Sequence, residues 1–222
     1  MTRWATFDVY GTLIDWRGGI GSELARIWPD EDAERLLERY HELEPQVEEG
    51  RSIPYRDVLA ETLALLASEE GLGLPPGEEG ALGDSLPSWT PFPEVPGALA
   101  ELRSGGFRLA PLSNTDPEFL AASFERIGVP IDGQITALDA GSYKPAAGHW
   151  ERFFERYGAD RDQHVHVAAS LFHDIAPADR LGLRAVWINR LGEASDLPRA
   201  AELKDLSRLP DVLDELVPQA TL

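Results

Sequence analysis

The segment FDVYGTLID, residues 7–15, places an aspartate where catalytic chemistry is possible. An apolar run predicts a buried strand that ends at Asp8, and Gly11 then turns the chain. Open α/β sheets place their active sites just beyond the carboxyl ends of the strands. A carboxylate there can act as a nucleophile rather than as a metal ligand when no second acid lies close by. The usual place for a second acid is two residues later, and that residue is Tyr10.

Three more polar groups follow predicted strands or lie just beyond them. These groups are Ser113 with Asn114, Lys144 in SYKP, and Ser170 with Asp174 in ASLFHD. Each group alone is typical of an ordinary turn, cap or surface residue. Side chains from several parallel strand ends converge above the sheet, however, so the four groups in this order indicate one shared site.

The elements that must position these groups alternate in type after a helical block. Three segments have the composition of buried strands: FRLAPLS at 107–113, HVHVAAS at 164–170 and RAVWINR at 184–190. This βαβ rhythm predicts an α/β fold with a parallel sheet and helices on both faces. We expect residues 1–15 and 90–222 to form the core domain and residues 16–89 to form an inserted helical cap.

Local signals predict where some helices begin and end. Pro45 is expected to kink or end the helix predicted over residues 31–44. Ser52 is expected to cap the next helix, with Pro54 in its first turn. Asp116 is the expected N-cap of a helix that Gly128 stops.

Composition narrows the class of protein and its partners. The chain has 222 residues, 43% of them hydrophobic, which is ordinary for a globular protein. The formal charge of −19 makes nucleic acid and anionic membrane surfaces poor partners. The absence of cysteine excludes disulfides and thiolate chemistry. No signal peptide and no long apolar run is recognised, so a cytoplasmic protein is expected.

Over nearly its whole length, the chain resembles the haloacid dehalogenase-like hydrolase superfamily and, within it, the type II 2-haloacid dehalogenases. The resemblance rests on DVYGTLID followed at the right distances by LSN, YKP and a Ser-xxx-Asp loop. It implies a Rossmann-like core with a helical cap inserted after the first motif. The superfamily's phosphatases use Asp-x-Asp and bind Mg²⁺, whereas Tyr10 and Ser170 replace two of their acids here. The resemblance therefore implies chemistry without a metal or cofactor.

The resemblance also implies a mechanism for a small 2-haloalkanoic acid. Asp8 would attack the carbon next to the substrate carboxylate, expel halide and form an aspartyl ester that water hydrolyses. Lys144 would keep Asp8 ionised, and Asp174 would orient or activate the water. The residues implied in substrate binding are Tyr10, Thr12, Arg39, Ser113, Asn114, Trp150 and Ser170.

The chain departs from the family pattern at several positions. Ala169 and Leu171 flank Ser170 where the family has polar residues, and Trp150 replaces a tyrosine. Arg39, five residues before Glu44, matches the family's substrate arginine, but it could equally be an exposed helix arginine.

Three histidines have open roles. His173 could assist proton transfer beside Asp174 or form a loop contact. His164 and His166 share one face of a predicted strand, where packing or exposure is expected.

Two other functions remain open from the sequence. One is a Mg²⁺-dependent phosphatase with an unusual site, and the other is a catalytically silent binding protein that kept the fold. Apolar positions on the cap helices could form a homodimer surface or pack within the cap.

Overall fold

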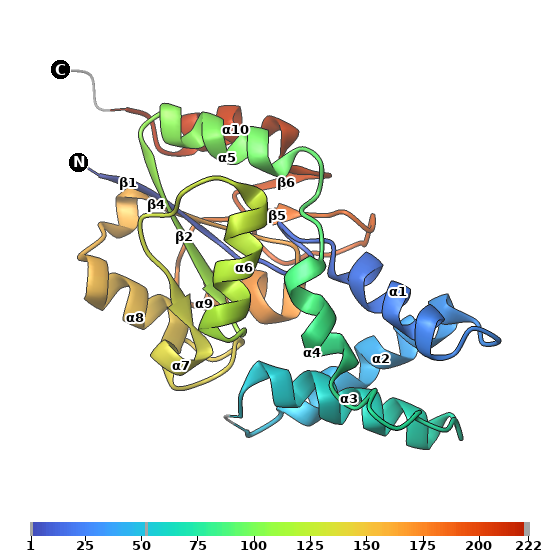
Figure 1. Cartoon of the computed structure of the whole chain (residues 1–222). Helices are drawn as coiled ribbons and strands as arrows, with labels where there is room; N and C mark the ends of the chain where they lie inside the picture. Colours follow the sequence, from blue (N-terminus) through green and yellow to red (C-terminus); the bar gives the residue numbers. More distant parts are fainter. Residues whose placement is uncertain (1, 52, 220–222) are drawn as a thin grey trace.

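The computed structural model describes residues 2–51 and 53–219, in which a parallel sheet forms the centre of the molecule (Figure 1). Its six strands run in the order β3-β2-β1-β4-β5-β6, and every neighbouring pair is parallel. The strands are β1 Arg3–Phe7, β2 Phe107–Ser113, β3 Ile135–Thr136, β4 His164–Ala168, β5 Ala185–Ile188 and β6 Ala201–Leu203. The predicted α/β fold is thereby confirmed, with β1 in the middle of the sheet.

Helices cover both faces of the sheet and also gather beyond one end of it (Figure 1). In the figure, α1 to α4 lie together, away from the helices that flank the strands. The helices are α1 Trp16–Ile27, α2 Ala33–Glu48, α3 Tyr55–Glu69, α4 Ala81–Ser85, α5 Val95–Ser104, α6 Pro117–Ile127, α7 Ala137–Ala140, α8 Gly148–Tyr157, α9 Ala176–Arg180 and α10 Leu209–Leu216. None of those in the described ranges is both long and apolar enough to cross a bilayer.

Alternation along the strands divides the core between the two faces. Successive strand side chains point to opposite faces, so Ala5 and Phe7 join one apolar cluster whereas Trp4 joins the other. The first cluster also holds side chains of α5, α6 and α10. The second holds Trp150 and Phe153 of α8 together with residues around α9.

The first apolar cluster extends without interruption into α1 to α3. It contains Leu24, Tyr40 and Leu63 together with Phe7 of the central strand. The division into a core and a cap at residues 16 and 89 stays a prediction, but its two parts share one continuous cluster of buried side chains.

One helix end differs from the prediction. Pro45 was expected to kink or end its helix, and it does not end it, because α2 continues to Glu48 and the next N–H bonds to the Pro45 carbonyl at 3.1 Å. Proline removes only one intrahelical bond, and here that loss falls in the last turn. The predicted cap Ser52 lies outside the described residues. Gly128 ends α6 in the left-handed conformation, as predicted.

Asp116 occupies the N-cap position of α6, as predicted, but its side chain caps a different helix. Its side chain makes no hydrogen bond to the first turn of α6. Its carboxylate instead accepts hydrogen bonds from the N–H groups of Tyr55 and Arg56, both at 3.0 Å. A carboxylate after β2 therefore binds the N-terminus of α3, where unpaired N–H groups favour an anion.

Candidate active site

The Asp8 carboxylate lies directly after the central strand, at the start of the turn that contains Gly11. Gly11 in that turn has φ of 91°, and a Cβ there would lie 2.8 Å from Nε1 of Trp16. Glycine is therefore the residue that the turn requires. The Thr12 hydroxyl donates to Asp8 Oδ2 at 2.7 Å and accepts from the Ala169 N–H at 2.9 Å. This directed pair of bonds fixes one oxygen of Asp8.

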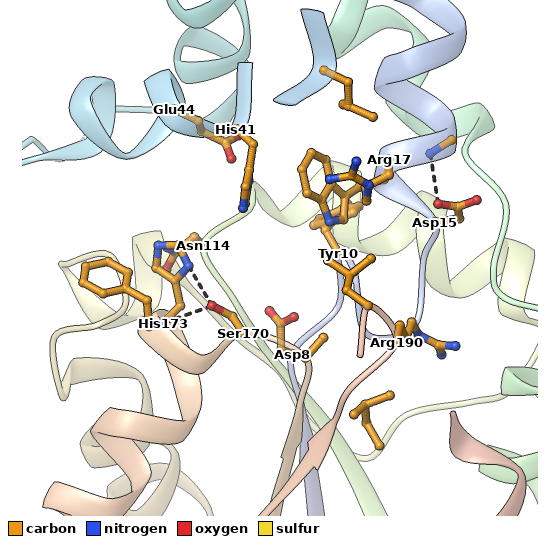
Figure 2. A pocket seen from close by; sticks show the side chains of 18 of the residues that line it. Asp8, Tyr10, Asp15, Arg17, His41, Glu44, Asn114, Ser170, His173 and Arg190 are labelled. Atoms are coloured by element: carbon orange, nitrogen blue, oxygen red, sulfur yellow. Dashed lines mark hydrogen bonds between the residues drawn. The ribbon is translucent and has the colours of Figure 1, made fainter. Parts of the chain in front are cut away.

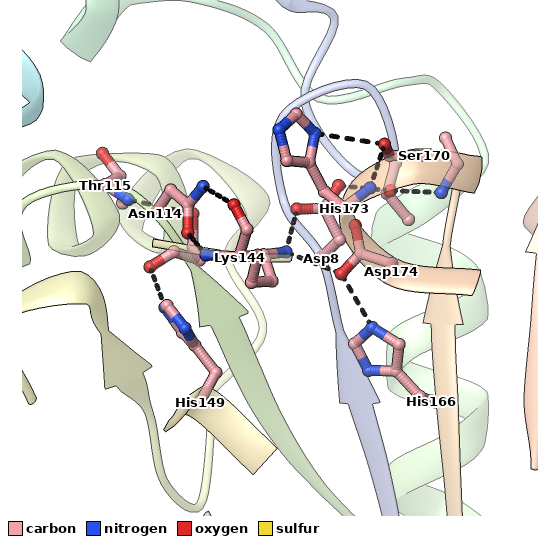
Figure 3. Close-up of polar contacts among 12 residues, drawn as sticks. Asp8, Asn114, Thr115, Lys144, His149, His166, Ser170, His173 and Asp174 are labelled. Atoms are coloured by element: carbon pink, nitrogen blue, oxygen red, sulfur yellow. Dashed lines mark hydrogen bonds and ion pairs between the residues drawn. The ribbon is translucent and has the colours of Figure 1, made fainter. Parts of the chain in front are cut away.

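Lys144 joins two carboxylates beyond the carboxyl ends of β1 and β4 (Figure 3). Its Nζ donates to Asp8 Oδ1 at 2.8 Å and to Asp174 Oδ1 at 2.7 Å, and its side chain is 2% exposed. The Asn114 side chain holds the Lys144 backbone in place, because its Oδ1 accepts from the Lys144 N–H and its Nδ2 donates to the Lys144 carbonyl. The ammonium group is thus fixed against the candidate nucleophile.

Asp174 lies in a single π-helical turn, Leu171–Ile175, that follows β4. Such turns are rare and occur often at functional sites. The Asp174 side chain is fully buried, and its Oδ1 also lies 2.9 Å from Nε2 of His166. Its Oδ2 has no hydrogen-bond partner among the described residues. One carboxylate oxygen is therefore held twice, and the other is free to accept.

Lys144 and Asp174 each favour the charged form of the other. Burial disfavours the ammonium form of Lys144, but Asp174 and Asp8 outweigh this and raise the pKa of Lys144. Burial alone would raise the pKa of Asp174, but Lys144 and His166 lower it below the usual range. Burial and the Lys144 charge lower the pKa of nearby His149 to about 3, so this histidine is neutral. The arrangement keeps an ammonium group next to ionised Asp174.

A cavity of about 940 Å³ opens above these groups (Figure 2). Asp8, Lys144 and Asp174 line its floor, and apolar side chains form part of its walls. Those apolar side chains include Tyr10, Trp16, Leu37, Phe92, Leu171, Phe172, Ile188 and Leu191. The volume is larger than a two- or three-carbon acid requires and lies within the range of ordinary small-molecule sites.

The wall that α2 provides is acidic and faces Asp8 across the cavity. Glu44 and Glu48 line it, and the Tyr55 hydroxyl donates to Glu44 Oε1 at 2.9 Å. Burial, together with the neighbouring Glu48, raises the pKa of Glu44 to about 7. Glu48 Oε2 also lies 3.7 Å from Nε2 of His173, whose Nδ1 is 3.2 Å from the Ser170 hydroxyl. His173 thus contacts α2 as well as the loop after β4.

Most of the predicted site residues are brought together. Seven of them line the cavity: Asp8, Tyr10, Ser113, Asn114, Lys144, Ser170 and Asp174. Thr12 is completely buried behind Asp8 and touches it directly. The Tyr10 hydroxyl pairs with that of Ser123 at 3.1 Å, and burial raises the pKa of Tyr10 to about 12. Tyr10 therefore forms a neutral part of the wall.

Two predicted substrate-binding residues lie away from the cavity. Arg39 pairs with Glu42 and Glu69 on the exposed side of α2. The cavity-lining positions of α2 are 33, 34, 37, 41, 44 and 48, which share one helical face that does not include position 39. Trp150 is 1% exposed and packs on the sheet against the His166 ring, because α8 turns its apolar face inward.

Two arginines that the sequence did not single out line the cavity instead. Arg17, at the start of α1, pairs with Glu34 and Glu38 of α2. Arg190 follows β5 and donates to the Thr12 carbonyl at 2.8 Å. Arg190 is the last residue of the strand predicted over 184–190, so the strand-end argument that selected Asp8 could have found it.

The donor set does not fit a Mg²⁺ ion. Mg²⁺ requires near-octahedral oxygen ligands and is usually held by one or two carboxylates plus substrate phosphates and water. Here Asp8 and Asp174 both accept from one ammonium group, which lies between them. A divalent cation would have to displace Lys144 from both carboxylates, and the uncharged side chains of Tyr10 and Ser170 would not compensate for that loss.

Comparisons with known proteins agree with this geometry. A sequence profile described as haloacid dehalogenase-like hydrolase matches residues 2–182. The chain belongs to this family.

Two relatives and one solved structure are similar to this chain over most of its length. The chain is 29% identical over 227 residues to haloacetate dehalogenase H-2 of Moraxella sp. strain B, covering 95% of this chain and 94% of the relative. It is 28% identical to the (S)-2-haloacid dehalogenase of Pseudomonas sp. strain YL, covering 84% and 82%. The crystal structure of the L-2-haloacid dehalogenase RSc1362 superposes with a TM-score of 0.86 at 25% identity, covering 96% and 99%.

Proposed function

We propose that this protein is a hydrolase of the 2-haloacid dehalogenase type that acts on carbon–halide bonds. The observation that carries the proposal is the Asp8 carboxylate, which Lys144 and Thr12 hold from two sides at the floor of a cavity. The similarity to haloacetate and (S)-2-haloacid dehalogenases over most of the chain supports the same substrate class.

In the first step, Asp8 displaces the halide. An oxygen of its carboxylate forms a bond to the carbon that bears the halogen, and the halide leaves with the electron pair of the broken bond. Lys144 orients the attacking carboxylate through its 2.8 Å contact with Asp8 Oδ1. The Ser113 hydroxyl and the second N–H of the Asn114 amide are the proposed donors to the substrate carboxylate, since the α2 wall is acidic.

In the second step, water hydrolyses the ester. Water attacks the carbonyl carbon of Asp8 and its proton passes to Asp174. The bond between that carbon and the product oxygen then breaks, and Asp174 returns the proton to the leaving oxygen. The product is the 2-hydroxy acid, and the oxygen from water remains in the Asp8 carboxylate. Lys144 contacts both Asp8 and Asp174 and so stabilises the negative charge that moves between them. Ser170 lies at the same wall and is proposed to contact the substrate.

Halide release from chloroacetate and 2-chloropropionate, with and without a chelator, tests the proposal. We expect release in both cases, and a folded protein that releases none from a panel of small haloacids would contradict it. One turnover in heavy-oxygen water should label the peptide that contains Asp8. Mg²⁺-dependent hydrolysis of a phosphate ester, abolished by the chelator, would instead identify a phosphatase.

We further propose the setting in which this activity occurs. The charge of −19 supports a small-molecule substrate rather than nucleic acid. We propose a cytoplasmic protein with a cap at residues 16–89, in which apolar cap positions could also form a homodimer surface.

A further inference from the structure

A buried chain of hydrogen bonds runs from side chains of β1 and β4 to Asp174. Nδ1 of His166 lies 2.8 Å from the Thr6 hydroxyl, and the same hydroxyl lies 2.8 Å from Nε2 of His164. All three side chains are completely buried, as is Asp174. Thr6 of β1 stands in register with His166 of β4, so neighbouring strands bring these groups together (Figure 3 shows the contact between His166 and Asp174).

The contacts indicate in which direction the hydrogens point. Asp174 Oδ1 already accepts from Lys144, so His166 Nε2 must carry the proton that it shares with this oxygen. In a neutral His166, Nδ1 then accepts from Thr6, and Thr6 accepts from Nε2 of His164.

The far end of the chain favours the same direction. His164 Nδ1 has no partner in the part of the chain that the structure describes. When Nε2 of His164 donates to Thr6, Nδ1 of the neutral His164 ring carries a lone pair and no proton. The opposite direction would leave a buried N–H there without an acceptor and would require a charged His166, and orphaned buried N–H groups are rare. Every donor in the chain therefore points toward Asp174.

We infer that Thr6 and His166 are positioning residues for the hydrolysis of the aspartyl ester. They hold Oδ1 of Asp174, which also accepts from Lys144, and so fix the carboxylate that receives the proton of the attacking water. This role rests on the proposed function, because it concerns the second step alone. Displacement of halide by Asp8 requires Lys144 and Thr12, and neither bonds to Thr6 or His166.

Thr6→Val tests the inference, because it removes the hydroxyl and keeps the side-chain shape. In a single turnover, we expect halide release within about twofold of the unsubstituted protein. Ester breakdown should slow about 2- to 13-fold, the value of one hydrogen bond between neutral groups, so the ester on Asp8 accumulates. Thr6→Ser should restore breakdown. Thr62→Val, at another fully buried threonine, whose hydroxyl has no partner in the described residues, is the matched control.

Nitrogen NMR of the histidine rings provides a readout that needs no substrate. The unsubstituted protein should show His166 protonated at Nε2 and bare at Nδ1, and Thr6→Val should disturb this state. A proton on Nδ1 of His166 would overturn the direction of the chain. Ester breakdown that is unchanged in Thr6→Val would overturn the positioning role alone, whereas an unsubstituted protein without halide release would overturn the proposed function.

Discussion

Replacing Lys144 by methionine should destabilise the fold in a pH-dependent way. The substitution leaves the buried carboxylates of Asp8 and Asp174 without the cation that both contact. One of them must then bind a proton for the protein to stay folded. An ordinary aspartate has a pKa of about 3.9, so neutralising it at pH 7 costs about 4 kcal/mol. Removing one partner of a buried ion pair costs a similar amount, about 3–5 kcal/mol.

The sign of the pH dependence follows from proton uptake on folding. In the unsubstituted protein, Asp174 has a pKa below its usual range despite its burial, mainly because of Lys144. That stabilisation is complete above the pKa of the unfolded chain and is lost only as the pH falls through the folded value. In Lys144→Met, folding binds a proton, so stability falls as pH rises. The difference between the two proteins should grow by about 1.4 kcal/mol per pH unit between pH 5 and 7.

Urea unfolding at pH 5, 6 and 7 measures this difference. A loss of about 4 kcal/mol corresponds to a fall of about 8 to 16 °C in Tm for a chain of this size. Lys204→Met is the matched control, because Lys204 is exposed and should change stability little at any pH. A loss for Lys144→Met that is below about 1 kcal/mol at pH 7, or that is the same at all three values, would refute the reasoning.

Three further substitutions test the site and its surroundings. Asp8→Asn should abolish halide release by at least about 1000-fold while circular dichroism shows an intact fold, because it removes the nucleophile. Arg17→Ala should raise KM for the haloacid, whereas Arg39→Ala should leave KM within about twofold, since only Arg17 lines the cavity. Equal KM effects of the two would contradict this placement. Asp116→Ala should lower the free energy of unfolding by about 1–2 kcal/mol, measured in urea, through loss of the cap on α3. No change relative to Glu118→Ala on exposed α6 surface would argue against that cap.

The floor of the site was predictable because it depends on strand ends. Asp8 and Ser113 each come at or just after a parallel strand, and parallel strands bring such positions to one edge of the sheet. Asp174 lies on the turn that follows a third strand. Lys144 donates to both Asp174 and Asp8 and so links them. The roles of these residues stay proposals, but their proximity follows from the order of elements along the chain.

The cap wall was harder to predict, because a helix presents its side chains in every direction. A spacing of five residues from Glu44 selected Arg39, but the face of α2 toward the cavity carries His41 and Glu44. The apolar residues Leu36 and Tyr40 mark the buried side of α2, but which other side closes over the sheet depends on how α2 docks.

The hydrogen-bond chain to Asp174 was also outside the reach of local patterns. The alternation of His164 and His166 correctly placed both on one face of a strand, and packing or exposure was expected there. Their partner Thr6 is about 160 residues away in sequence, and only the pairing of β1 with β4 brings it close.

The apolar cluster shared by the sheet and α1 to α3 has a consequence for how the molecule melts. Phe7, Tyr40 and Leu63 belong to the same buried network, so losing the helical part would strip cover from the central strand. Unfolding should therefore be cooperative, with a single calorimetric transition whose van't Hoff and calorimetric enthalpies agree. Excising residues 16–89 should then yield an aggregating remnant rather than an independent sheet domain.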